Sequence, residues 1–241
     1  NLGVLLTSAN KKDDAKKEFE AALKMDPNYA SAYYNLAVMC FQNQKTECIA
    51  NNAVKAFEKY EEKRLRSEAA LIAAYGFVDA KDKKSALKYA ALAHQSVDRN
   101  IGEHILYVEG RLAGIYVGLE EWALASQTVH GLFTEAPHAP SVMKAILSAY
   151  GDSAPKAQVE SVFTALLTKH KADLEAQGYL LFHRGVFRFN RGAQSEAVAA
   201  FKLARPTFAK VLKPDHAVFG EIDGVLEQAK TISDKSASQK K

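Results

Sequence analysis

The chain has few of the residues that build chemical sites. Only two of its 241 residues are cysteine, Cys40 and Cys48, and none of its seven histidines stands four residues from another or beside a cysteine. Zinc sites need such clusters, so none is expected. A single pair of cysteines does not make a disulfide framework, and Cys40 is interpreted as a small buried thiol. No phosphate-binding loop, Gly-x-Ser-x-Gly or His-Glu-x-x-His motif occurs. The sequence therefore predicts no metal, no cofactor and no catalytic residue.

Proline and glycine are also scarce, at 6 and 13 residues, which leaves little room for linkers. No apolar run approaches the roughly 20 residues that a membrane helix needs. The net charge of +4 is too small to indicate nucleic acid without a basic patch. The run Lys59–Arg66 contains Glu61 and Glu62, so it is interpreted as a solvated helix end. We expect a folded chain that binds no nucleic acid and spans no membrane.

The compartment stays open at this stage. The chain begins at Asn1, inside a predicted helix, so we expect a preceding segment that could hold a signal peptide, an anchor or further helices. Two reduced-looking cysteines and a lysine-rich surface favour the cytoplasm. A periplasmic or anchored location remains the alternative.

What the chain does have is a repeated spacing of small and aromatic residues. Ala15-x3-Phe19-x2-Ala22 near the start returns as Ala197-x3-Phe201-x2-Ala204 near the end. Similar intervals recur at multiples of about 34 residues, with each copy long enough for two amphipathic helices. The first copy has the fullest pattern, formed by Leu2, Gly3, Leu6, Ala15, Phe19, Ala22 and Pro27.

In these spacings the chain resembles the tetratricopeptide-repeat (TPR) family over residues 1–204. The resemblance implies an all-α superhelical solenoid of about six helix–turn–helix repeats, with a concave face built from the first helix of each repeat. We predict a repeat array over 1–206, a C-terminal capping helix over 207–232 and a disordered basic tail over 233–241. The predicted repeats are 1–29, 30–66, 67–101, 102–138, 139–175 and 176–206.

The concave face is the predicted binding site. On three first helices, positions about four apart carry apolar and aromatic residues where a solvated wall would be polar. We expect this groove to bind a peptide or helix of another protein. The alternative is that these residues pack among themselves or under the C-terminal helix. The predicted wall is Tyr34, Val38 and Phe41, then Leu71, Tyr75 and Val78, then Phe182, Val186 and Phe189.

The fourth repeat carries glycines four residues apart, Gly110, Gly114 and Gly118, on its groove side. Glycine inside a helix costs about 1 kcal/mol relative to alanine, so the stripe predicts a helix docked against it, from a partner or from the C-terminal helix. The alternative is a stripe without a purpose.

Basic residues gather on the sixth repeat at Arg184, Arg188 and Arg191. They could contact an acidic partner. The favoured interpretation is pairing with nearby acids such as Glu175 or Glu196.

The sequence thus predicts a non-catalytic scaffold or adaptor. Two alternatives remain: a self-assembling oligomer, and the regulatory or carrier arm of a larger enzyme. A clamp for a C-terminal carboxylate, known in part of the family, is not expected. Asn1 and Asn35 match its asparagines, but Glu68 and Ile72 stand where it needs basic residues.

Overall fold

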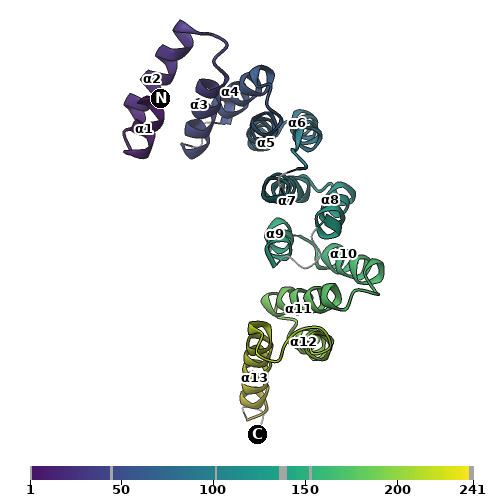
Figure 1. Ribbon diagram of the computed structural model, residues 1–241. Helices are drawn as coiled ribbons and strands as arrows, with labels where there is room; N and C mark the ends of the chain where they lie inside the picture. Colours follow the sequence, from purple (N-terminus) through teal and green to yellow (C-terminus); the bar gives the residue numbers. More distant parts are fainter. Residues whose placement is uncertain (1, 44–45, 101, 136–139, 152–153, 239–241) are drawn as a thin grey trace. The chain divides into compact units, whose positions relative to one another are not determined.

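The computed structural model describes residues 2–43, 46–100, 102–135, 140–151 and 154–238. Within these ranges it contains thirteen α-helices and no strand (Figure 1), so the predicted all-α class is confirmed. The chain divides into two compact units, Asn1–Thr128 and Val129–Lys241. None of the helices in the described ranges is both long and apolar enough to cross a membrane.

The first unit is a row of helix pairs. α3 contacts α5, and α5 contacts α7, so these three helices form one layer (Figure 1). α4 packs on α3 and α5, and α6 packs on α5 and α7, as a second layer. The boundary between the units falls within α8, Trp122–Glu135. The helices of this unit are α1 (Leu2–Ser8), α2 (Lys12–Met25), α3 (Ala30–Gln42), α4 (Thr46–Lys59), α5 (Lys63–Asp79), α6 (Lys83–Ser96) and α7 (Gly102–Gly118).

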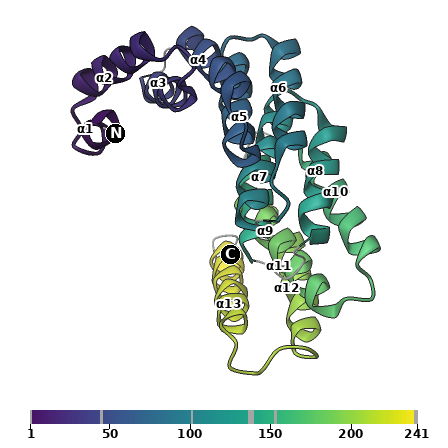
Figure 2. The same cartoon turned by 45° about the horizontal axis from the view of Figure 1, so that its top comes forward.

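The second unit repeats this arrangement and ends in a long helix. α11 packs on α9, α10 and α12, and α13 follows after residues 209–216 and turns back along α12 (Figure 2). The sequence placed one capping helix over 207–232, whereas α12 extends to Phe208 and α13 runs through Ser238. Residues 239–241 of the predicted tail lie outside the described residues. The helices are α9 (Pro140–Tyr150), α10 (Lys156–Lys169), α11 (Leu174–Asn190), α12 (Gln194–Phe208) and α13 (Ala217–Ser238).

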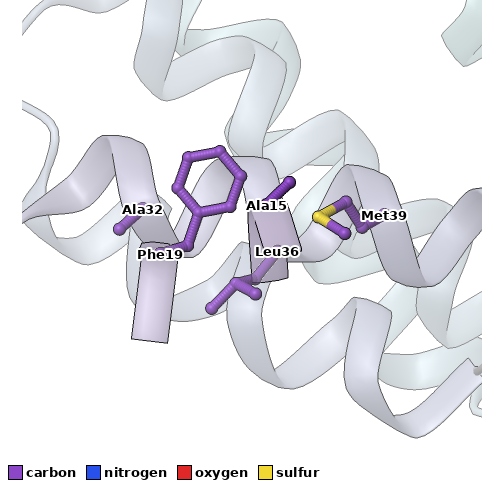
Figure 3. Packing of buried hydrophobic residues seen from close by; sticks show 5 residues of the cluster. All are labelled: Ala15, Phe19, Ala32, Leu36 and Met39. Carbon is purple, nitrogen blue, oxygen red and sulfur yellow. The ribbon is translucent and has the colours of Figure 1, made fainter. Parts of the chain in front are cut away.

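Helix pairs close around small residues that meet an aromatic ring sixteen positions later. A Cβ on Gly3 would lie 2.6 Å from the Phe19 ring, and one on Gly185 would lie 2.8 Å from the Phe201 ring. The missing side chain lets the second helix approach, and the ring fills the space. Figure 3 shows the same buried layer around α2 and α3, formed by Ala15, Phe19, Ala32, Leu36 and Met39.

The turns inside the pairs share one conformation. Asn10, Lys81 and Glu120 have positive φ angles of 58°, 59° and 59°, although none is glycine. In each case the next amide donates to the carbonyl five residues back, as in Lys11 N to Leu6 O at 2.8 Å. This Schellman pattern satisfies the carbonyls at the end of the first helix. The turn thereby fixes where the second helix starts.

The cysteines depart from the sequence prediction. Cys40 and Cys48 are joined by a disulfide with a Cα–Cα distance of 5.8 Å, and neither is a free thiol. The bridge connects the end of α3 to the start of α4. A pair of cysteines in different helices cannot be recognised as bonded from spacing alone, because their separation depends on the connection between the helices. The bridge removes the argument that favoured the cytoplasm.

Candidate functional site

The layer of first helices in the first unit encloses a groove of about 430 Å³. Three helices contribute side chains: α3, α5 and α7. These helices are the first helices of successive repeats, and they lie side by side because α3 packs on α5 and α5 packs on α7. The groove is lined by Tyr34, Val38, Phe41, Leu71, Ile72, Tyr75, Tyr107 and Arg111.

The middle of the groove is apolar and partly exposed. Leu71 forms its buried floor with 2% exposure, whereas Phe41 and Tyr107 are 49% and 38% exposed. The rings of Phe41 and Tyr75 lie 6.1 Å apart and are tilted by 59°. Rings in such contact present a continuous wall at little conformational cost. The wall can therefore cover apolar side chains of a bound segment.

One end of the groove carries a carboxylate whose charge is matched. Tyr34 Oη donates to Glu68 Oε2 at 3.2 Å, and Arg64 Nε donates to Glu68 Oε1 at 3.3 Å. His104 Nε2 stands 3.9 Å from the same carboxylate and 3.1 Å from Ser67 Oγ. Burial and the nearby Glu68 charge raise the pKa of the Tyr34 phenol, so it stays protonated and donates.

The other end carries a cation without an acid. Arg111 Nη1 donates to the Tyr107 carbonyl oxygen at 3.1 Å, and the guanidinium lies 3.8 Å from the centre of the Tyr107 ring. Among the described residues no carboxylate pairs with it. Arg111 and Tyr75 line the same groove; burial raises the pKa of the Tyr75 phenol, and the positive charge of Arg111 opposes that rise. Arginine has five N–H donors, so most of its donors remain for a ligand.

Five predicted wall residues line this groove: Tyr34, Val38, Phe41, Leu71 and Tyr75. Val78, the sixth predicted wall residue of this unit, is half-buried and does not line the groove.

The sequence prediction missed Tyr107 and Arg111, although a signal existed. They stand 36 residues after Leu71 and Tyr75, which is one repeat later.

The glycine stripe itself does not line the groove. Gly110 and Gly114 are half-buried in α7, and Gly118 ends the helix at an exposed position. A Cβ on Gly118 would meet open space within 4 Å. This glycine has no neighbour to accommodate, so the stripe's predicted role as a docking site for a helix stays a prediction.

In the second unit the predicted wall residues divide between core and partial exposure. Phe182 is buried, with 7% exposure, and its ring packs on Phe201 of the next helix at 5.7 Å. It is a core residue because it stands three residues before Gly185, on the side of α11 that meets the Phe201 ring of α12. Val186 and Phe189 are half-buried.

The three arginines of α11 all have partners within the second unit. Arg184 Nε and Arg188 Nε donate to the two oxygens of Glu160, at 2.7 and 2.6 Å. Arg191 donates to the carbonyl oxygens of Ala154 and Gly151, both at 2.8 Å.

The Glu160 carboxylate is stabilised in its charged form. Burial would raise its pKa, but the hydrogen bonds from Arg188 and Arg184 outweigh that effect and lower it. The pairing interpretation is therefore favoured over an acidic partner, although the main acid is Glu160. Glu196 makes only an additional contact, 3.7 Å from Arg188.

Other kinds of site find no support in the described part of the chain. No group of three or more histidine, cysteine or acidic residues could hold a metal ion there. The Asn35 amide, which would serve a carboxylate clamp, donates to Ser31 O at 2.7 Å in its own helix. Asn1 lies outside the described residues.

Comparison with known proteins agrees with this architecture. The family model for the tetratricopeptide repeat matches residues 18–47, which cover most of α2 and α3. A tetratricopeptide-repeat protein from Parabacteroides merdae superposes with a TM-score of 0.52 at 15% identity, covering 95% of this chain and 82% of that one. The fold is that of a tetratricopeptide-repeat protein.

A second solved structure supports the same fold. The C-terminal part of a TPR-containing protein from Cytophaga hutchinsonii has a TM-score of 0.50 at 15% identity, covering 87% of this chain and 79% of that one. No curated protein matches the sequence. The predicted resemblance to the TPR family is thus confirmed for the fold.

Proposed function

We propose that this TPR chain is a non-catalytic interaction module that binds a segment of another protein in the groove between α3, α5 and α7. The observation that carries the proposal is the exposed aromatic wall. Phe41 and Tyr107 keep 49% and 38% of their surface in contact with solvent, although both line a concave site of about 430 Å³. Exposed aromatic residues gathered in a hollow typically mark a binding site, because covering them removes apolar surface from water.

The size of the groove suits a short stretch of polypeptide. Its floor is Leu71 and its sides are rings from three neighbouring helices, so several side chains of a bound segment could be covered at once. Aromatic residues in such a position are those that most often dominate binding energy. Removing two of them should therefore weaken binding far more than removing an exposed apolar residue elsewhere.

The test is quantitative affinity capture from extracts of the source organism. The bait proteins are the wild type, the groove variant Phe41→Ala/Tyr75→Ala and the control Leu203→Ala, since Leu203 of α12 is 59% exposed. We expect one or more proteins that the wild type and the control retain equally and that the groove variant loses. Equal recovery by all three baits would refute the proposal. Light scattering on the purified chain tests the alternative of a self-assembling oligomer. If the groove binds a second copy of this chain, the wild type should have the mass of an oligomer and the groove variant the mass of a monomer.

A further inference from the structure

The groove is electrostatically asymmetric, and this asymmetry restricts what can bind. At one end the Glu68 carboxylate is matched by Arg64 at 3.3 Å and by the Tyr34 hydroxyl at 3.2 Å. At the other end the Arg111 guanidinium has only its own helix's carbonyl and the Tyr107 ring as partners among the described residues. A partner therefore meets one charge in the groove that is not neutralised, and that charge is positive.

Two phenol hydroxyls accompany this guanidinium. Tyr75 and Tyr107 line the groove with Arg111, and neither hydroxyl makes a hydrogen bond within the described residues. Burial raises the pKa of Tyr75, which keeps its phenol protonated and able to donate. The site thus offers several donors and no competing acceptor charge, which is the requirement for binding a carboxylate.

Building on the proposed function, we infer that the bound segment is apolar and carries an aspartate or glutamate side chain that pairs with Arg111. The acid is inferred from charge complementarity with Arg111, and the apolar residues next to it are inferred from the aromatic wall that fills the rest of the groove. Arg111 is exposed where it lines the groove, so a carboxylate can reach it from solvent and accept two of its N–H groups in a bidentate contact.

A side-chain carboxylate fits better than the carboxylate at a chain end. A terminal carboxylate would need further donors, yet the Asn35 amide is engaged with Ser31 O at 2.7 Å. Glu68 is an acceptor already paired with Arg64, and Ile72 has no polar group, so neither supplies a donor. Arg111 is thus the single cation in the lining.

The experiment uses peptides selected from a random dodecamer library on the wild-type chain, then synthesised with an amidated C-terminus. Their affinities are measured by fluorescence anisotropy, each peptide beside a version with its acid changed to the amide. For the wild type we expect the acid-to-amide change to weaken binding about 10-fold or more. For Arg111→Gln the same change should cost less than about 2-fold, because the partner charge is gone.

Controls separate a failure of this inference from a failure of the proposed function. Lys63→Gln removes the same charge from an exposed position of α5 and should behave as the wild type. Phe41→Ala/Tyr75→Ala should abolish binding of every selected peptide. Circular dichroism of each variant checks that it is folded.

Three outcomes would overturn the inference. An equal loss from the acid-to-amide change in wild type and Arg111→Gln would remove the pair while leaving the groove as the binding site. If the selected peptides bind only when they are synthesised with a free C-terminus, the carboxylate that Arg111 binds would be the one at the chain end. If no peptide is selected, or if selected peptides ignore Phe41→Ala/Tyr75→Ala, the proposed function fails together with the inference.

Discussion

Replacing Gly76 with alanine should destabilise the first unit, although alanine is the better helix former. Gly76 lies in α5 where that helix crosses α4. A Cβ at this position would lie 2.8 Å from the backbone nitrogen of Ala50, 3.1 Å from its Cα and 2.9 Å from Ile49 Cγ2. Two of these atoms belong to the backbone, so no side-chain rotation relieves the contact. The helices must separate, which costs roughly 1–3 kcal/mol.

The Gly76→Ala clash is opposed by the higher helix propensity of alanine, and this stabilising contribution can be measured separately at another glycine. Glycine to alanine inside a helix stabilises by about 1 kcal/mol. Gly131 of α8 is exposed, and a Cβ there would meet nothing within 4 Å. Gly131→Ala should therefore stabilise by up to about 1 kcal/mol. Gly76→Ala gains the same helix propensity but also bears the cost of the clash, so its net effect should be a destabilisation of up to about 2 kcal/mol.

Urea unfolding followed by circular dichroism gives both changes in the free energy of unfolding. Hydrogen exchange measured by mass spectrometry then shows where the Gly76→Ala chain opens, and we expect faster exchange in α4 and α5. If Gly76→Ala stabilised the chain as much as Gly131→Ala, the close approach of these two helices would be refuted. A loss confined to helices of the second unit would refute the reasoning as well.

Three further predictions concern the charges and the disulfide. Glu160→Gln should lower the free energy of unfolding by about 2 kcal/mol at neutral pH. Because the pKa of Glu160 is lowered from 4.5 in the folded chain, this difference should persist above pH 4.5 and vanish as the pH falls through the folded-state pKa. A difference between variant and wild type that stays constant at acid pH would contradict this prediction. His183 is half-buried, with its Nδ1 atom enclosed, and burial lowers its pKa from 6.5 to about 4. The unfolded chain therefore binds a proton that the folded chain does not, and stability should decrease as the pH falls from 6.5 to 4. His183→Leu should remove about 3 kcal/mol of that pH dependence, and an unchanged slope of stability against pH would speak against the burial. Reduction of the Cys40–Cys48 bridge, which closes a loop with a sequence separation of 8, should cost about 2 kcal/mol, an effect that Cys40→Ala/Cys48→Ala should no longer show on adding reductant.

The helix pairs could be predicted because their packing depends on local spacing. Gly3 with Phe19 and Gly185 with Phe201 are sixteen residues apart, a separation fixed by two short helices and one tight turn. Such contacts lie within one repeat, so the sequence pattern and the structure carry the same information. The wall on α3 and α5 followed from the same regularity, since Tyr34 and Val38 on α3 correspond to Leu71 and Tyr75 on α5, one repeat later.

The features that the sequence did not reveal depend on contacts between elements. Arg184 and Arg188 pair with Glu160, 24 and 28 residues upstream on another helix, and no spacing rule links these positions. Phe182 was predicted on the concave wall, yet its ring packs on Phe201 of α12. One position around a helix is about 100°, so a small error in register exchanges core and groove. The disulfide likewise depends on how one connection folds.

The central claim is that a partner segment lies in the groove between α3, α5 and α7. Its most direct test is photo-crosslinking with benzoylphenylalanine placed at Phe41, and separately at Leu203, in extracts of the source organism. Phe41 is 49% exposed and lines the groove, while Leu203 is 59% exposed on α12. The account predicts a discrete crosslinked protein from position 41, absent from position 203 and suppressed by Arg111→Gln. Crosslinks of equal yield and identity from both positions, or none from position 41, would contradict it.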